Sequence, residues 1–172
     1  MKKVTGLFLL LAFSLLSCFS AQTGKPAPAF SIASGDDKVV NRDTFKNRLL
    51  IIIYETKDNV EDNRKFKTEL GALLASSDTL KNSSTVLPVI NCSSAFWPVS
   101  AIWKGNLMRN SEKEKITIYG DWDGKMFSSY KFKDKASNVV IVDKDGIIRY
   151  FHTGVMDDDD IREARNVIVS LA

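Results

Sequence analysis

The chain contains few of the residues on which metal and thiol chemistry depend. Among its 172 residues there are two cysteines, Cys18 and Cys92, and one histidine, His152. A single histidine excludes multi-histidine metal sites and leaves little for a Ser-His or Cys-His catalytic pair. The formal charge of +3 is mixed along the sequence, with no basic stripe of the kind that binds nucleic acid. We therefore expect no metal, no bound cofactor and no nucleic-acid partner.

The first residues are typical of a targeting segment and not of a folded domain. A positively charged start precedes an apolar run, Leu7–Leu16, that is short for a membrane span. The run ends in Leu-Leu-Ser-Cys, which resembles a bacterial lipobox whose cysteine, here Cys18, becomes lipidated. Cleavage near Ala21 without lipidation is the alternative, although a bulky residue then stands at −3. We expect a lipoprotein signal peptide over residues 1–17 and export to the periplasm.

Residues 18–28 are small, polar and proline-containing, and we expect them to form a tether. The remaining residues, 29–172, have the length of a single domain. If Cys18 carries lipid, Cys92 has no partner for an internal disulfide. The domain must then rely on its hydrophobic core, which a chain of this length can build by burying about two-thirds of its unfolded surface.

The domain alternates between strand-like and helix-like segments. We predict strands over 30–33, 38–41, 49–54, 85–91 and 116–119 and on both sides of Asp145-Gly146, and helices around 66–74, 98–107, 126–130 and 161–171. Helices between buried strands imply right-handed crossovers and a mixed sheet. Asp145-Gly146 favours a tight hairpin turn, which adds antiparallel strands at the carboxyl-terminal end.

Four local patterns refine this prediction. Asp58 with Glu61 is a plausible capping box for the helix that follows strand 49–54. Pro88 is awkward within a strand and indicates a bulge or a position near an edge. The run Asp157–Asp160 is explained better as a capped helix start than as a calcium site, since adjacent carboxylates point in different directions. Val99, Ile102, Trp103 and Leu107 are expected on one helix face, with Trp103 in the core.

This layout resembles the thioredoxin fold in its peroxiredoxin-like (AhpC/TSA-type) branch, a three-layer α/β fold with an N-terminal β-hairpin added to a mixed central sheet. The resemblance is carried by Gly24–Phe30, by the strand-helix unit at 49–74 and by residues 123–150. More narrowly, Ser137–Gly154 and the export signal are similar to the YtfJ family, exported bacterial proteins of poorly defined function.

The resemblance also implies where redox chemistry would lie. Redox-active members place Cys-x-x-Cys or a peroxidatic cysteine at the helix that follows the first central strand, where the helix dipole stabilises a thiolate. The matching positions here are occupied by Thr56, Lys57, Asp58 and Asn59. Residues 136–138 stand where such members carry a cis-proline, and none of them is a proline. Thioredoxin or peroxidase activity is therefore not implied.

Two functions compete on this sequence. The first is an exported, lipid-anchored, non-catalytic binding or structural module of the bacterial cell envelope, with an unknown envelope protein as partner. Phe96 and Trp97 would form its recognition patch if they lie in a loop, although helical spacing also permits a place in the core. The second is an atypical thiol oxidoreductase or peroxidase that uses Cys92. Pro98, or alternatively Ser93 or Ser94, would start the next helix and bring a thiolate-favouring amino-terminus near Cys92, whereas a buried unreactive thiol is the simpler interpretation.

Overall fold

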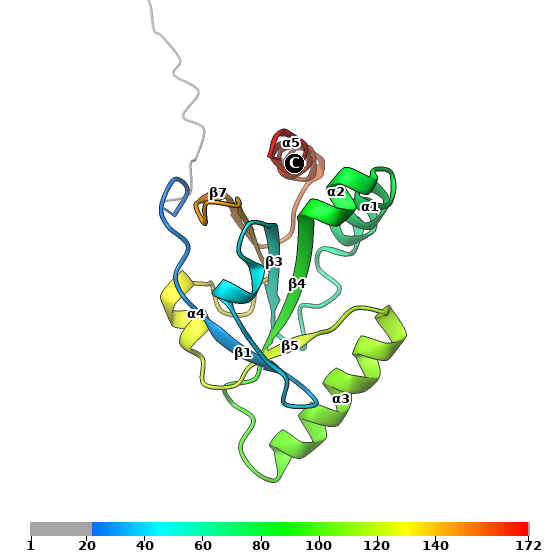
Figure 1. Ribbon diagram of the computed structural model, residues 1–172. Coiled ribbons are helices and arrows are strands. Elements are labelled where there is room, and N and C mark those ends of the chain that lie inside the picture. Colours follow the sequence, from blue (N-terminus) through cyan, green and yellow to red (C-terminus); the bar gives the residue numbers. More distant parts are fainter. Residues whose placement is uncertain (1–21, 172) are drawn as a thin grey trace, which may run out of the picture.

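The computed structural model describes residues 22–171 (Figure 1). The predicted signal peptide, 1–17, and the predicted lipidation site, Cys18, lie outside this range. From Gln22 onward, no helix combines the length and apolar character needed to cross a membrane.

Seven strands form one mixed sheet, in the order β2-β1-β5-β4-β3-β6-β7. The strands are β1 (Ser31–Ser34), β2 (Val39–Asn41), β3 (Leu49–Glu55), β4 (Ser84–Asn91), β5 (Tyr119–Asp121), β6 (Asn138–Val142) and β7 (Ile148–Thr153). β3, β4 and β5 are parallel to one another, whereas β6 is antiparallel to β3. The carboxyl ends of β3, β4 and β5 therefore share one edge of the sheet with the amino end of β6.

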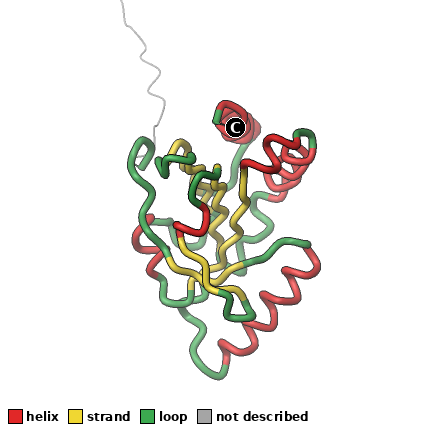
Figure 2. The backbone as a smooth tube through the Cα atoms, viewed as in Figure 1, coloured by secondary structure: helices red, strands yellow, loops and turns green. Residues whose placement is uncertain are grey.

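Helices cover both faces of this sheet. They are the 3-10 helix η1 (Arg42–Phe45) and the α-helices α1 (Arg64–Ala75), α2 (Asp78–Ser83), α3 (Val99–Glu114), α4 (Lys125–Tyr130) and α5 (Asp158–Ser170). In Figure 1, α1, α2 and α5 lie on one side and α4 on the other, while α3 extends along the β1–β5 end. Figure 2 shows the same three layers as helices, strands and connecting loops.

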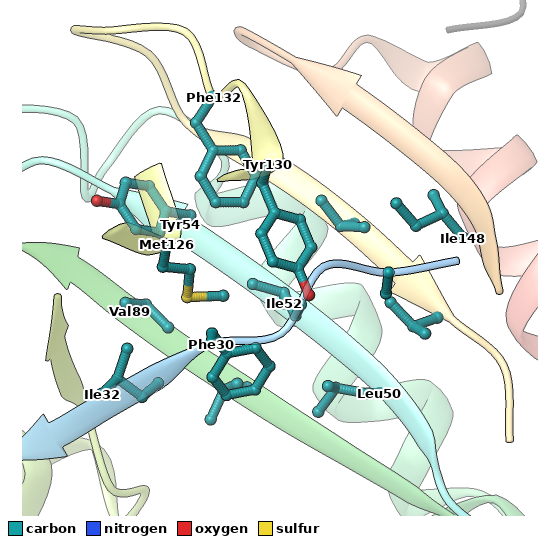
Figure 3. Close-up of a cluster of buried hydrophobic side chains, with 14 of the residues drawn as sticks. Phe30, Ile32, Leu50, Ile52, Tyr54, Val89, Met126, Tyr130, Phe132 and Ile148 are labelled. Atoms are coloured by element: carbon teal, nitrogen blue, oxygen red, sulfur yellow. The ribbon is translucent and has the colours of Figure 1, made fainter. Parts of the chain in front are cut away.

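The central strand β3 supplies both hydrophobic cores. All seven of its residues are buried, and successive side chains point to opposite faces. Ile51 and Ile53 pack against α1 and α5. Ile52 and Tyr54 pack against α4 and the amino-terminal segment, in the cluster drawn in Figure 3. A run without alternation is what a strand buried on both faces requires.

The carboxyl-terminal part of the fold confirms the sequence prediction. β6 and β7 form an antiparallel hairpin, and Gly146 in its turn has a φ of +81°, a conformation that glycine adopts without strain. Asp157 caps α5 by accepting hydrogen bonds from the backbone amides of Asp159 and Asp160. The run of carboxylates thus forms the start of the helix, as expected.

The predicted capping box at Asp58 and Glu61 is wrong. α1 begins only at Arg64, after the cap residue Asn63, and residues 57–63 form turns. The Asn63 side chain is buried. Its Nδ2 donates a hydrogen bond to the carbonyl of Gly154 at 3.0 Å, and its Oδ1 accepts one from the amide of Met156 at 2.9 Å. A contact between segments far apart in sequence therefore sets the start of this helix.

Two other elements differ from the prediction. β5 covers Tyr119–Asp121 and not 116–119, because the end of α3 holds the preceding residues: the Ser111 hydroxyl accepts a hydrogen bond from the amide of Ile118. The short helix α2 was not predicted.

The position of Pro88 agrees with the sequence prediction. β4 passes through Pro88 without a bulge, and β5 pairs with β4 only from Val89 onward. At Pro88, β4 is therefore paired with β3 alone, which agrees with the predicted position near an edge.

The residues from Gly24 to Ala27, expected within the tether, pair with the β6–β7 turn. The Gly24 amide donates to the carbonyl of Ile148 at 2.8 Å, and the Ile148 amide donates to the carbonyl of Lys25 at 2.9 Å. The described chain therefore begins at the edge of the sheet opposite the carboxyl ends of β3 and β4.

Candidate functional site

The four positions that match the redox site lie in a loop stabilised by its own hydrogen bonds. The Thr56 hydroxyl donates to Oδ1 of Asn59 at 2.6 Å, and the Asn59 amide side chain donates to Asp62 at 2.8 Å. Lys57 forms an exposed ion pair with Asp58 at 2.7 Å. Because α1 begins at Arg64, none of the four lies at a helix amino-terminus.

Directly before this loop, a buried carboxylate joins the two segments that build the active site in redox-active thioredoxin folds. Glu55, the last residue of β3, is 4% exposed. Its Oε2 accepts a hydrogen bond from Nζ of Lys67 at 2.7 Å, and its Oε1 accepts one from the Ser137 hydroxyl at 2.9 Å. Lys67 also donates to the Val60 carbonyl at 2.7 Å. This Glu55–Lys67–Ser137 network ties α1, the loop after β3 and the segment before β6 together.

The segment before β6 is also held by Asn138, the buried first residue of β6. The side-chain amide of Asn138 donates to the carbonyls of Lys133 and Ala136, and its oxygen accepts from the Thr153 hydroxyl at 3.0 Å. The peptide bonds here are trans; within residues 22–171 the cis bond is Trp97–Pro98. Side-chain hydrogen bonds thus hold the backbone where redox-active members use a cis-proline.

Cys92 follows β4 and is completely buried. Its thiol faces Gly120, and Asp121 lies close by. Burial, and to a lesser extent the Asp121 carboxylate, raises the pKa of the Cys92 thiol to about 12. α3 begins at Val99 with Pro98 as its cap residue, so the helix starts at the first of the predicted places and not at Ser93 or Ser94. The thiol therefore stays protonated and out of solvent at neutral pH.

Asp121 is the centre of a small buried polar cluster beside Cys92. Its Oδ2 accepts hydrogen bonds from the Tyr54 hydroxyl and from the Phe127 amide, both at 2.9 Å. Burial first, and Asp121 second, raise the pKa of the Tyr54 hydroxyl well above its usual value. The other oxygen, Oδ1, is buried without a hydrogen-bond partner in the described part of the chain. The cluster connects β3, β5 and α4.

Phe96 and Trp97, the candidates for a recognition patch, lie on the surface. Phe96 is 76% and Trp97 86% exposed, in the loop that leads into α3. Val99 and Ile102, expected to face the core, are also exposed, and Trp103 is only half-buried. The expected core position of Trp103 is therefore wrong, since α3 buries only Leu107 fully. We call Phe96, Trp97, Val99 and Ile102 the α3 patch.

The remaining candidate is His152, whose Nε2 is buried without a hydrogen-bond partner in the described part of the chain. His152 lies on β7, stacks on Tyr150 and approaches Asp160 at 3.4 Å. Between Gln22 and Leu171, no three His, Cys, Asp or Glu side chains cluster in a way that could hold a metal ion.

Comparison with known proteins identifies the architecture. No family model and no curated protein matches the sequence. Among solved structures, a putative thiol:disulfide interchange protein DsbE from Chlorobium tepidum superposes with a TM-score of 0.65 at 15% identity, over 87% of this chain and 98% of that one. The chain has the thioredoxin-like fold.

Two further solved structures share this fold. The thiol peroxidase from Chromobacterium violaceum has a TM-score of 0.62 at 12% identity, and each chain is 86% covered. A peroxiredoxin-like protein from Aquifex aeolicus has a TM-score of 0.57 at 16% identity, and each chain is 87% covered. At these identities the likeness concerns the thioredoxin-like fold and not the chemistry.

The Glu55–Lys67–Ser137 network was missed by the sequence interpretation. The predicted strand ends at Tyr54, one residue before Glu55, and the residues that follow Glu55 are mostly charged or polar. The signal that could have found it is its position: a strand buried on both faces that continues for one more residue must bury that residue too. A buried carboxylate then requires a cation and a hydroxyl donor.

Removing the cation of this network tests its role. We expect Lys67→Met to lower the free energy of unfolding by about 2–3 kcal/mol, because it leaves Glu55 buried without its cation. Lys65→Met is the matched control, since Lys65 pairs with Asp158 at the surface and such pairs contribute less than about 1 kcal/mol. Urea denaturation measures both variants. Equal effects of the two substitutions would show that the buried pair contributes nothing special.

Proposed function

We propose that this protein is a thioredoxin-fold binding module of the bacterial cell envelope that has lost redox chemistry. It is exported, lipid-anchored through Cys18, and recognises an envelope protein through the α3 patch. The narrower relationship to the YtfJ family belongs to the same proposal.

The observation that carries the proposal is the Glu55–Lys67–Ser137 network. It occupies the junction of β3, α1 and the segment before β6, where redox-active members keep a thiolate. Every hydrogen-bonding oxygen of the Glu55 carboxylate has a partner within the protein. A carboxylate with satisfied oxygens and 4% exposure stabilises structure and offers nothing to a substrate. Contact with other molecules is therefore left to exposed surface.

The α3 patch supports recognition of a partner. An aromatic side chain presents roughly 150–250 Å², so Phe96 and Trp97 together expose on the order of 300 Å² of apolar surface. Ile102, 64% exposed, is a further apolar side chain at the surface, in the first turn of α3. Contiguous apolar surface of several hundred Å² is typical of interaction sites, and tryptophan is frequent among residues that dominate binding energy.

The position of the patch suits a lipid-anchored protein. The described chain begins beside the β6–β7 turn, at the amino-terminal edge of β3, whereas the loop bearing Phe96 and Trp97 follows the carboxyl end of β4. An anchor at Cys18 would thus attach one end of the molecule to the membrane and leave the α3 patch at the other end, accessible to a protein.

The thiol chemistry of Cys92 separates this proposal from an atypical oxidoreductase. We expect iodoacetamide to leave Cys92 unmodified in the native protein near pH 8.5, since a thiol whose pKa is about 12 holds its proton there. Modification rates measured against pH should rise only toward pH 12, while the urea-unfolded chain reacts with an ordinary cysteine pKa of about 8.5. A native thiolate already present near neutral pH would favour the oxidoreductase.

Recognition through the α3 patch can be tested by photocrosslinking. A photoreactive phenylalanine analogue at position 97 should crosslink an envelope protein in cells, and Ile102→Asp should abolish the product by placing a charge in the apolar contact. The same analogue at Val39, an exposed residue of the edge strand β2, is the control. Products of equal yield from both positions, or none from position 97, would contradict recognition by the patch.

The lipid anchor has its own test. Radiolabelled palmitate should be incorporated into the wild-type chain and into Cys92→Ser, but not into Cys18→Ser. Because the chain has only these two cysteines, the pair of variants assigns the label without ambiguity. An unlabelled wild-type chain would refute lipidation and leave plain secretion.

A further inference from the structure

A shallow hollow at the amino-terminal end of β3 is lined by several basic side chains. It lies between η1 and the β6–β7 turn, and its basic lining residues are Arg42, Lys46, Arg48 and Lys144. The net charge of the whole chain is only +3, so this concentration is local. We call it the basic hollow.

The acidic groups near the basic hollow are already engaged or exposed. Asp143, the acid in its lining, is buried, pairs with Nε of Arg149 at 2.5 Å and accepts the Ile147 amide at 2.8 Å. These hydrogen bonds outweigh burial and keep the pKa of Asp143 below its usual value, so it stays ionised and paired. Asp43 forms an exposed ion pair with Lys46 at 3.1 Å, and Asp145 lies exposed in the turn.

Arg42 is held at the hollow by neutral groups. Its Nη1 donates to the carbonyl of Ala27 at 3.2 Å. Its guanidinium rests directly on Gly146, where the Cβ of any other residue would collide with it. The glycine therefore creates the space that this arginine occupies. A guanidinium has five N–H donors, and the contact with Ala27 uses one of them.

Arg48 is also held by hydrogen bonds to neutral groups. Its Nε donates to the Thr85 hydroxyl at 2.6 Å, and its Nη2 donates to the carbonyl of Ser84. Within residues 22–171, neither Arg42 nor Arg48 lies within ion-pair distance of a carboxylate. Both side chains are half-buried. Two partly desolvated guanidinium groups without counterions, at one hollow, favour a bound anion.

We propose that the basic hollow binds a phosphate group, supplied by the headgroup of an anionic phospholipid. Arginine and lysine together are the residues that recognise phosphate in proteins, the first by paired hydrogen bonds and the second as a point charge. The choice of a lipid as the source rests on the proposed anchor at Cys18, whereas the phosphate site itself does not.

The position of the hollow explains why the phosphate would come from a membrane. Arg42 donates to the Ala27 carbonyl, and the Ala27 amide donates to the Gly146 carbonyl at 2.8 Å, so the hollow adjoins a residue five positions after the start of the described chain. Cys18 precedes Gln22 by only four residues, which span roughly 14 Å when fully extended. A lipidated Cys18 would hold the hollow close to the headgroups, where the attraction of basic residues to anionic lipid acts.

The experiment uses the chain from residue 18 with Cys18→Ser, which cannot be lipidated. Its affinity is measured for phosphatidylcholine vesicles with and without phosphatidylglycerol, and for inorganic phosphate through the amide NMR signals of Gly146 and Lys144. Lys46→Gln with Lys144→Gln removes two exposed charges from the hollow. Lys113→Gln with Lys133→Gln is the control with equal net charge, because these exposed lysines lie outside the hollow.

We expect binding only to the phosphatidylglycerol vesicles, and displacement of the signals of Gly146 and Lys144 by inorganic phosphate. The hollow variant should lose roughly 25-fold in vesicle affinity, since each basic residue at an anionic surface contributes about a factor of five, and the control should lose far less.

Three results would overturn the proposal. Equal losses in the two variants would show general electrostatic attraction. Phosphate binding without vesicle binding would exclude the lipid as the source. No binding of either probe would exclude the site. None of these bears on the α3 patch, on Cys92 or on the lipidation of Cys18, so a failure here leaves the proposed function to its own tests.

Discussion

The burial of β3 on both faces is the constraint on which the rest of the structure depends. Its isoleucine-rich run has no polar side, so a layer of helices must cover each face. Burying each of these large side chains contributes about 1.5–3 kcal/mol. The strand therefore accounts for the two hydrophobic cores and the central place of β3 in the sheet.

The same constraint shapes the edge where thioredoxin folds carry out their chemistry. β3 remains buried through Tyr54 and Glu55, so a hydroxyl and a carboxylate are drawn inside and need partners there. Asp121 accepts the first, while Lys67 and Ser137 donate to the second. The place that holds a reactive thiolate in redox-active thioredoxin folds carries a closed set of hydrogen bonds here.

Local patterns predicted the parts of the fold whose determinants lie close together in sequence. The β6–β7 hairpin depends on Asp145-Gly146, and the start of α5 depends on Asp157, which caps its own first turn. The start of α1 could not be predicted in this way, because Asn63 is fixed by residues of the loop after β7. Likewise, the spacing of Val99, Ile102 and Trp103 indicated one helix face but not that this face would remain uncovered.

The sequence by itself determined the alternation of strands and helices, the thioredoxin-like architecture and the absence of a redox cysteine pair after the first central strand. The alternation and the missing cysteine pair follow from side-chain period and residue identity, which are local properties, whereas the architecture was implied by the resemblance to a known family. Only the tertiary structure decided that Glu55 is a buried network member, that Cys92 is a protonated core thiol and that four basic residues share one hollow. Burial, pKa and convergence of charge depend on which distant segments meet, and packing alone establishes that.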